Sequence, residues 1–254
     1  FKKDLEKHHD QLKKAINGKA VLVIGGGGTI GSSYIRELVR FEPRTLVVVD
    51  ISENYLTELT RDLRSAHGVK VPETYITYPI NFGDPVFDKV LQKYGPFDIV
   101  ANFAAHKHVR SEKDQHSVTA LLENNIIKAE RLLNKLSANP PEHFFCVSTD
   151  KAANPVNIMG ASKKIMEEVI MSYSNLFPIT TARFANVAFS NGSLLAGYLE
   201  RLMKNQPFSS PSDIRRFFVS PQESGQICLM ACILGQSGDI FFPKLEDEQM
   251  MNFK

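Results

Sequence analysis

The stretch "AVLVIGGGGTIGSSYIREL", residues 20–38, decides the fold of this chain. Its apolar beginning, residues 20–24, predicts a short buried strand, and its second half predicts a helix. Between the two lie Gly25, Gly28 and Gly31, in a G-x-x-G-x-x-G spacing. Glycines at such a turn let the backbone approach a pyrophosphate, and the free N–H groups of the following helix attract it. The stretch therefore predicts a dinucleotide-binding turn.

The next strand-like run, "TLVVVD" at residues 45–50, supports this interpretation. It ends in Asp50, about twenty residues after the glycines, where an acid binds the ribose hydroxyls of an adenosine. A glycine triplet alone is a weak signal, and a turn that serves only packing is the alternative. The succession of strand, glycine turn, helix, strand and acid favours a dinucleotide site over that alternative.

Strands and helices keep alternating up to residue 148. Helical patterns occupy residues 53–66, 85–94 and 118–136, and strand-like runs occupy residues 74–80, 97–105 and 143–148. This alternation predicts an α/β fold with a Rossmann-type doubly wound parallel sheet, which binds its ligands at the carboxyl ends of the strands. The alternation stops beyond Ala185. We therefore expect an N-terminal helix at residues 1–18, an NAD(P)-binding Rossmann domain at residues 19–185 and a smaller C-terminal substrate-binding portion at residues 186–254.

The composition is that of an ordinary soluble protein, with 254 residues, 43% of them hydrophobic and 23% charged. A net charge of +2 gives no reason to expect nucleic acid as a partner. Cys146, Cys228 and Cys232 lack the paired spacing of metal ligands, so we expect reduced core cysteines, a cytoplasmic protein and no metal site. No apolar run is long enough to cross a bilayer. Because the chain starts at Phe1 rather than Met, a membrane anchor outside this segment stays open.

A group of polar side chains follows the apolar run "HFFCVS" of residues 143–148. Thr149, Asp150 and Lys151 are consecutive there, and Lys163 lies on the helix that follows. A hydroxyl, a carboxylate and two amines at one strand end make a candidate site for acid–base chemistry. The alternative is an ion pair on a surface loop.

Five motifs together resemble the extended short-chain dehydrogenases/reductases: "GGGGTIGS", "NFAAHKHV", "STDKAANPVNIMGASK", "RFANVAFSNGS" and "DIRRFF". Within them the chain is similar to the UDP-N-acetylglucosamine 4,6-dehydratases of bacterial polysaccharide biosynthesis, over roughly residues 18–250. The resemblance implies a lyase: the sugar is oxidised at C4 by a nicotinamide, deprotonated at C5, loses water across C5 and C6, and receives the hydride at C6. Relatives usually continue further, so we expect the substrate-binding portion to be incomplete.

The resemblance also implies roles for these side chains. Asp150 would protonate the departing C6 hydroxyl, and Lys151 would take the C5 proton. For that task a lysine needs a lowered pKa, which burial beside Lys163 could supply. Thr149 would hydrogen-bond the C4 oxygen, and Lys163 would hold the nicotinamide ribose.

Met159 departs from the Tyr-x-x-x-Lys pattern of the superfamily, in which the tyrosine takes the C4 hydroxyl proton. A thioether cannot accept that proton. One branch of the dehydratases carries methionine here and is regarded as active, so we expect activity, with Asp150 or Lys151 taking a second role. An inactive protein is the alternative.

The remaining site residues are also implied by the resemblance. The expected cofactor-binding residues are Gly25, Gly28, Thr29, Ile30, Gly31, Asp50, Asn81, Ala104 and Lys163. The expected substrate-binding residues are Lys107, His108, Asn186, Ser193 and Arg216. Arg216 would pair with the uridine diphosphate through its guanidinium fork, whereas His108 could equally serve packing. Asn125 matches a buried asparagine that supports the lysine of the motif.

The identity of the cofactor has two alternatives. The family favours NADP, and Arg40 and Arg44 are the expected partners of its additional phosphate. NAD stays open, because Ile51 follows Asp50 where an NADP-preferring relative often has arginine.

Three functions are compatible with these residues. The first is the 4,6-dehydratase, acting on UDP-N-acetylglucosamine as a homo-oligomer. The second is a UDP-hexosamine 4- or 5-epimerase, which shares the first steps; Asp150 favours elimination instead. The third is a non-catalytic protein that binds a nucleotide-sugar or NAD(P), which Met159 permits and which Lys151 and Lys163 argue against.

Overall fold

The computed structural model describes residues 1–109, 112–210, 215–244 and 250–252, and its centre is a parallel β-sheet. Within the described residues the sheet has seven strands in the order β10-β6-β5-β4-β1-β2-β3. The strands are β1 (Ala20–Ile24), β2 (Thr45–Asp50), β3 (Thr74–Pro79), β4 (Ile99–Asn102), β5 (His143–Val147), β6 (Ile179–Ala182) and β10 (Ile240–Phe241). Every neighbouring pair is parallel, which confirms the expected doubly wound α/β fold.

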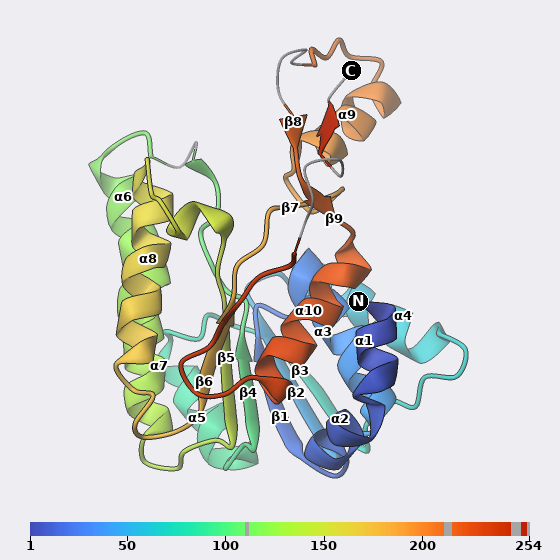
Figure 1. The fold of residues 1–254 in the computed structure, drawn as a ribbon, viewed down its shortest axis with the longest axis vertical. Coiled ribbons are helices and arrows are strands. Elements are labelled where there is room, and N and C mark those ends of the chain that lie inside the picture. The colour runs from blue at the N-terminus through green and yellow to red at the C-terminus, as the bar shows by residue number, and fades with distance from the viewer. Residues whose placement is uncertain (110–111, 211–214, 245–249, 253–254) are drawn as a thin grey trace.

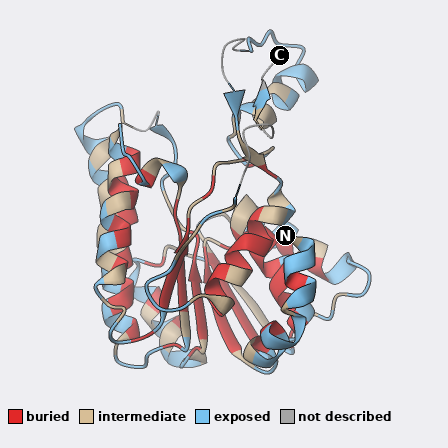
Figure 2. Ribbon diagram, viewed as in Figure 1, coloured by how far each residue is buried: buried red, intermediate tan, exposed pale blue. Residues whose placement is uncertain are grey.

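The strands are buried on both faces because their sequences are apolar throughout. All five residues of β1 are buried, as continuous apolar runs are in a sheet covered on both sides. Val21 and Val23 belong to one hydrophobic core, and Leu22 and Ile24 belong to the other. This division follows from the two-residue period of a strand. Figure 2 shows the buried strands between the inward faces of the helices.

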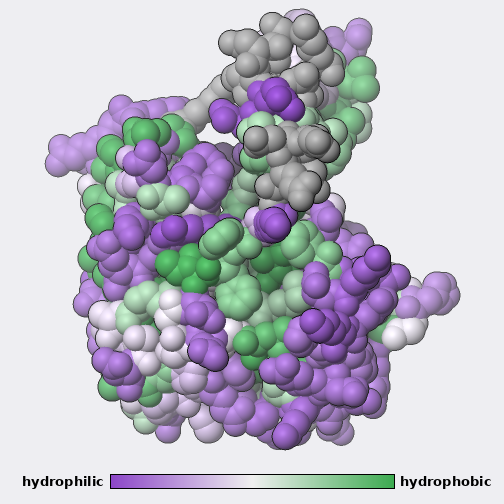
Figure 3. Space-filling view, viewed as in Figure 1, coloured by the Kyte–Doolittle hydropathy of each residue, from purple (hydrophilic) through white to green (hydrophobic). Residues whose placement is uncertain are grey.

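Two groups of helices supply these cores, on opposite faces of the sheet (Figure 1). One group consists of α1 (Lys2–Lys7), α2 (His9–Ile16), α3 (Thr29–Leu38), α4 (Glu53–Ser65) and α10 (Pro221–Leu234). The other consists of α5 (Pro85–Tyr94), α7 (Lys128–Leu136) and α8 (Ile158–Met171). Figure 3 shows hydrophobic side chains over β6 and the segment that carries β10, where Phe242 is exposed.

The N-terminal segment differs from the single helix that we expected. It forms two helices, α1 and α2, with a break at His8, whose φ of −104° and ψ of 16° lie outside the helical region. Leu12 and Ile16 of α2 are fully buried in the core. The break lets the apolar side chains of both short helices reach that core.

The division that we expected at residue 185 also differs from the structure. β10 pairs with β6 at the edge of the sheet, and α10 packs against α3. Residues 221–241 therefore complete the seven-stranded sheet and its helical cover, although we had placed them in the substrate-binding portion. The sequence hides this return because β10 has only two residues and because the buried residues of α10 show no single apolar stripe.

The rest of the C-terminal part forms a small lobe beyond the carboxyl ends of the strands (Figure 1). It contains α9 (Leu194–Met203), the parallel pair β7 (Asn186–Val187) with β9 (Phe218–Val219), and the antiparallel pair β8 (Arg215–Arg216) with β11 (Met251–Asn252). Residues 213–214 of the "DIRRFF" motif lie outside the described residues.

No helix in the described ranges is both long and apolar enough to cross a membrane. Cys146, Cys228 and Cys232 are free and buried, as predicted.

Gly225 provides a test of the crossing between α10 and α3. A Cβ at this position would lie 2.4 Å from the carbonyl carbon of Ser33 and 2.5 Å from its oxygen. We expect Gly225→Ala to lower the free energy of unfolding by about 1–3 kcal/mol, since two backbones would have to separate. Urea unfolding measures this change. The control is Gly197→Ala in α9, whose Cβ would meet the flexible end of Arg201 and should cause no loss. Equal stability of the Gly225→Ala protein would contradict the close crossing.

Candidate active site

The strand register brings the residues after several strands to one edge of the sheet. Ile24 at the end of β1 is paired with Val49 of β2 and with Asn102 of β4. Asn102 is paired in turn with Cys146 of β5. The segments that follow these strands therefore emerge side by side, as expected for a parallel sheet. A cavity of about 880 Å³ lies there, with walls formed by these segments and by the small lobe.

The cavity brings together almost all of the predicted site residues. Those that line it are Gly25, Gly28, Thr29, Ile30, Gly31, Asp50, Asn81, Ala104, Lys107, His108, Thr149, Lys151, Met159, Lys163, Asn186, Ser193 and Arg216. Asp150 is the exception. It is exposed, and its Oδ1 accepts hydrogen bonds from Thr149 Oγ1 at 2.9 Å and from Lys151 Nζ at 3.2 Å.

The glycine turn has the shape that a pyrophosphate needs. A Cβ on Gly25 would lie 2.5 Å from the backbone nitrogen of Ala104, and one on Gly31 would lie 2.3 Å from the oxygen of Gly25. A Cβ on Gly28 would make only an ordinary van der Waals contact, 3.5 Å from the oxygen of Gly25. Gly28 is also the N-cap of α3, and no side chain caps this helix. The first N–H groups of α3 are thus available to an anionic ligand, and these residues fit a dinucleotide.

Asp50 is fixed at the end of β2 by two backbone groups. Its Oδ2 accepts a hydrogen bond from the nitrogen of Gly27, and its Oδ1 accepts one from the nitrogen of Ser52, both at 2.9 Å. The carboxylate lines the cavity in this orientation. An adenosine ribose bound there would find two fixed acceptor oxygens.

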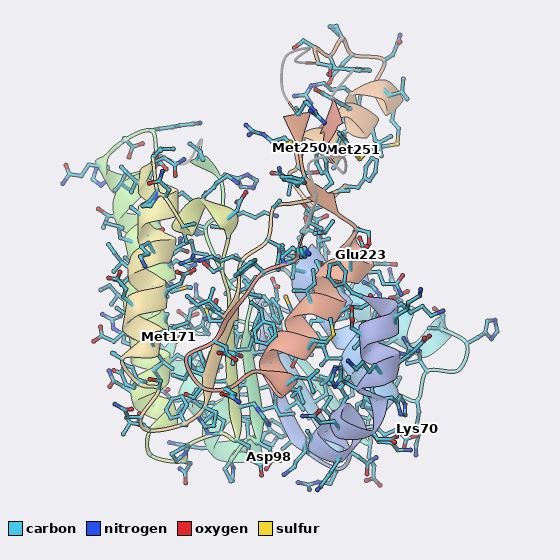
Figure 4. All side chains as sticks on the ribbon, viewed as in Figure 1. Lys70, Asp98, Met171, Glu223, Met250 and Met251 are labelled. Atoms are coloured by element: carbon cyan, nitrogen blue, oxygen red, sulfur yellow. The ribbon has the colours of Figure 1, made fainter. Side chains whose placement is uncertain are left out.

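Arg40 and Arg44 do not line the cavity, so their expected role as phosphate partners is wrong. Arg40 Nη1 donates to Glu37 at 2.9 Å. Arg44 precedes β2, so it lies at the amino end of a strand whose carboxyl end carries Asp50. Figure 4 shows this opposite edge of the sheet at Asp98, far from the lobe.

The segment after β5 forms a short 3₁₀ helix, η4 (Asp150–Ala152), with Thr149 as its N-cap. Thr149 Oγ1 accepts a hydrogen bond from the nitrogen of Lys151 while its hydroxyl donates to Asp150. The side chain of Lys151 is 41% exposed and is paired with Asp150. The burial beside Lys163 that we expected for Lys151 is therefore absent, because its carboxylate neighbour holds it at the mouth of the cavity.

Lys163 itself is buried, on the face of α8 that borders the cavity. Its Nζ donates to the carbonyl oxygen of Val147 at 2.8 Å. Burial lowers the pKa of Lys163, and the nearby Cys146 and Glu167 oppose this shift. Met159 lies one helical turn earlier on the same face and is also buried. The methionine thus occupies the cavity wall beside the lysine.

Asn125 lies in a π-helical turn, η3 (Glu123–Ile127), between α6 (Gln115–Leu122) and α7. Its Oδ1 accepts from the nitrogen of His106, and its Nδ2 donates to the oxygen of His106 and to Ser162 Oγ. Lys163 is not among its hydrogen-bond partners, so Asn125 does not support the lysine by a direct contact as we expected. Asn125 instead fixes the loop after β4, and π-turns are frequent at functional sites.

The lobe closes onto this loop and onto the glycine turn. Asn191 donates from its backbone nitrogen to Thr29 Oγ1 at 3.0 Å. Gly192, at a φ of +74°, lies against the ring of His108, since a Cβ would be 2.8 Å from Cε1. Partial burial lowers the pKa of His108, and the charge of Lys107 adds to this effect. His108 therefore packs against the lobe.

Several cavity residues were absent from the predicted set, and two of them carry a basic side chain. His106 and Lys128 both line the cavity, and Lys128 Nζ donates to Asn81 Oδ1 at 3.2 Å. His106 belongs to the "NFAAHKHV" motif and could have been found there. Lys128 carries no sequence signal, because it stands 47 positions from its partner. In the described part of the chain, no group of three His, Cys, Asp or Glu side chains could hold a metal ion.

Solved structures with the same fold cover nearly the whole chain. Pen from Bacillus thuringiensis has a TM-score of 0.81 at 22% identity, covering 94% of this chain and 71% of that one. The UDP-glucuronic acid 4-epimerase from Bacillus cereus, solved with UDP-glucuronic acid and NAD, has a TM-score of 0.77 at 16% identity, covering 92% and 79%. At these identities the similarity establishes the fold.

Sequence relatives are found in archaea and bacteria. The uncharacterized membrane protein MJ1061 of Methanocaldococcus jannaschii is 33% identical over 234 residues, which are 89% of this chain and 67% of that protein. The probable polysaccharide biosynthesis protein EpsC of Bacillus subtilis is 29% identical, and the match covers 91% of this chain and 38% of EpsC. The inverting UDP-N-acetylglucosamine 4,6-dehydratase of Campylobacter jejuni is 26% identical, covering 93% and 70%. A family model described as "Polysaccharide biosynthesis protein" matches residues 21–253. The chain therefore belongs to the polysaccharide biosynthesis protein family.

Proposed function

We propose that the chain is an enzyme of the short-chain dehydrogenase/reductase type that removes water from UDP-N-acetylglucosamine, giving a UDP-4-keto-6-deoxy-hexosamine. One observation carries the proposal: Thr149, Lys151 and Lys163 line the same cavity as the glycine turn and Asp50. Acid–base groups thus lie where a dinucleotide would place its reactive end. The dehydratase of Campylobacter jejuni among the relatives supports this choice of reaction.

A nicotinamide dinucleotide, held at the glycine turn by its pyrophosphate, would supply the redox chemistry by accepting a hydride from sugar C4 and returning it to C6. The protein has to move the protons. Thr149 Oγ1 lies 2.9 Å from Asp150 Oδ1, so its hydroxyl can pass the C4 hydroxyl proton to that carboxylate. Asp150 would then donate this proton to the C6 hydroxyl, which leaves as water. Asp150 thereby accepts the C4 hydroxyl proton in place of the superfamily tyrosine, because Met159 stands at the tyrosine position and cannot accept it.

Lys151 handles the remaining proton. It would take the proton from C5 next to the new ketone and return it to C5 after water has left, so the protons balance over the cycle. Lys151 and Asp150 lie 3.2 Å apart as an exposed ion pair. A lysine that accepts a proton has to be buried, so we propose that the bound sugar and cofactor cover Lys151 and supply the burial that the protein alone does not give it. The exposure of Asp150 leaves its carboxylate free to turn toward a sugar that enters there.

An epimerase is the second candidate, because the 4-epimerase of Bacillus cereus shares the fold. The two reactions differ in whether the C6 hydroxyl is protonated, and Asp150 supplies that proton in the dehydratase. We further expect a homo-oligomer, as in the resembling family, working in the cytoplasm.

The test is incubation with UDP-N-acetylglucosamine and the cofactor in deuterated water, followed by proton NMR and mass spectrometry. Water loss with a new C6 methyl group would support the dehydratase. Deuterium at C5 without water loss would point to an epimerase and overturn the dehydration. An unchanged sugar, with cofactor binding demonstrated separately, would point to a non-catalytic protein.

The end of β2 favours NAD over the NADP that the family resemblance implies. The cavity residues that follow β2 are Ile51, Ser52 and Tyr55, none of which carries a positive charge. A 2′-phosphate placed beside the fixed carboxylate of Asp50 would be repelled. We expect calorimetry to show that NAD binds at least about tenfold more tightly than NADP, and Asp50→Ala to narrow that ratio. Asp62→Ala, at an exposed carboxylate paired with Arg36, is the control. Tighter binding of NADP by the unmodified protein would contradict this assignment.

Asn81 presents a hydrogen-bond donor to the cavity. Its Oδ1 accepts from the nitrogen of Gly83 at 2.9 Å and from Lys128 Nζ at 3.2 Å. Both neighbours are donors, so only the amide oxygen can face them, and Nδ2 lies on the other side. With the ribose at Asp50 on β2, the adenine would lie further along the edge, near Asn81 after β3. An amide donor there suits an acceptor on the base.

Deamino-NAD, in which an oxygen replaces the adenine amino group and N1 gains a hydrogen, tests this assignment. An Nδ2 donor that faces N1 of adenine would face the new N–H group, so we expect deamino-NAD to bind about tenfold more weakly than NAD. Asn81→Asp puts an acceptor opposite N1 and should reduce or reverse this difference. Calorimetry measures both ratios. If the unmodified protein binds deamino-NAD as tightly as NAD, Asn81 does not present a donor to N1 of the base.

A further inference from the structure

A buried carboxylate lies directly behind the candidate active site. Glu167, on α8, is only 2% exposed. Its Oε1 accepts hydrogen bonds from Ser148 Oγ at 2.5 Å and from Arg183 Nε at 2.8 Å, and its Oε2 accepts one from Arg183 Nη2. Neither the sequence motifs nor the proposed chemistry gives Glu167 a task.

Glu167 and its two partners belong to three segments that each carry cavity residues. Ser148 immediately precedes Thr149 and the acid–base pair. Arg183 follows β6 and precedes Phe184, Ala185 and Asn186, which line the cavity. Glu167 itself follows Lys163 by one helical turn on the same face of α8. One carboxylate therefore joins the end of β5, the end of β6 and the helix of the buried lysine.

The backbone connects the two strand ends in the same place. The nitrogen of Ser148 donates to the oxygen of Ala182 at 2.9 Å, and the nitrogen of Asp150 donates to the oxygen of Phe184 at 3.4 Å. These bonds hold the ends of β5 and β6 together but do not reach α8. Lys163 Nζ connects α8 to the end of β5 through the oxygen of Val147, and the side-chain bonds of Glu167 extend this connection to Ser148 and to Arg183 after β6.

Stability alone is a poor reason for this arrangement. A buried ion pair loses the hydration of both charges, and an apolar pair of similar size is often as stable or more so. In addition, the hydroxyl of Ser148 is not needed to neutralise Glu167, because Arg183 already approaches both of its oxygens. A positioning role explains why the third bond goes to the residue before Thr149.

We propose that Glu167 is a positioning residue that holds the Thr149–Lys151 segment, the Lys163 helix and the segment after Arg183 in their catalytic register. The expected effect on turnover rests on the proposed function, whereas the expected effect on the arrangement of the three segments does not. Loss of these bonds should slow the chemical steps while leaving cofactor binding nearly unchanged, because the glycine turn and Asp50 belong to other segments.

The test uses Glu167→Gln, which keeps the size of the side chain but removes its charge. We expect turnover and C5 deuterium exchange to fall about 100-fold, with the dissociation constant of NAD within about threefold of that of the unmodified protein. The matched control is Glu168→Gln, the next residue, which is exposed and paired with Lys164. It should leave all three quantities unchanged.

Two additional variants separate positioning from folding. Ser148→Ala keeps the ion pair and should slow turnover about tenfold with little change in the unfolding midpoint. The double variant Glu167→Leu with Arg183→Met removes both charges and should recover stability without recovering turnover. Turnover within threefold of normal in Glu167→Gln, or full recovery of turnover in the double variant, would overturn the proposal.

Hydrogen exchange tests the geometry without any reaction. In Glu167→Gln, backbone amides of residues 148–152 and 183–187 should exchange at least tenfold faster, whereas those of β1 should not change. If the unmodified protein does not react with the sugar, the proposed function is refuted, and hydrogen exchange alone decides whether Glu167 positions these segments. Unchanged exchange in both segments would then overturn the positioning role.

Discussion

Replacing Asp150 by Asn is expected to stop the loss of water and to leave C5 deprotonation possible only in a sugar that is already oxidised at C4. The amide keeps the shape of the side chain but cannot take the C4 hydroxyl proton from Thr149 or give it to the C6 hydroxyl. Removal of a general acid typically slows a reaction by about 10²–10⁴-fold, and we expect about 10³-fold here. Lys151 remains in place and can still exchange the C5 proton when the sugar is oxidised.

The readout is the isotope pattern of the sugar in deuterated water. In Asp150→Asn we expect neither water loss nor deuterium at C5 from UDP-N-acetylglucosamine, but deuterium at C5 without water loss when the sugar is supplied as its 4-ketone. Cofactor affinity should not change, because Asp150 does not line the cavity. Asp88→Asn is the matched control, since Asp88 is also an exposed aspartate paired with a lysine, Lys135, on a helix outside the cavity. Dehydration at the normal rate by Asp150→Asn would refute its role as the acid.

The fold and most of the polar residues that line the cavity could be predicted, because both follow from local patterns. The glycine turn and the apolar runs specify where strands end, and a parallel sheet then brings those ends to one edge. Asp50, Asn81, Thr149 and Lys163 are far apart in the chain but line one cavity for this reason.

The orientation of side chains could not be predicted in the same way. Whether Lys151 is buried or exposed depends on how η4 turns after β5, which no motif encodes. Asn125 was expected at the lysine, but a π-turn rotates it toward His106. Such rotations are decided by packing between segments that are distant in sequence. The return of β10 to the sheet was missed because a two-residue strand has no periodicity to detect.

Lys163 offers the second large effect, because it is the buried cation of the cavity wall. We expect Lys163→Met to weaken NAD binding about tenfold and to reduce turnover about 10³-fold or more. Methionine preserves the apolar stem and the volume of lysine, so the loss should come from the ammonium group and not from a void. Burial lowers the pKa of Lys163 and makes this cation costly to hold.

A site that buries a lysine without an ion pair needs another reason to keep it. Its Nζ makes hydrogen bonds to the oxygen of Val147 and the sulfur of Met166, and Glu167 acts on it through space without a direct ion pair. We therefore expect Lys163→Met to fold with at least the stability of the unmodified protein, measured by urea unfolding, while cofactor affinity falls. Lys164→Met, at the next position, removes an exposed lysine paired with Glu168 and should change neither affinity nor turnover. Normal cofactor affinity in Lys163→Met would show that the lysine does not contact the ribose. A gain in stability together with a loss of binding would show that the buried ammonium is retained for its ligand.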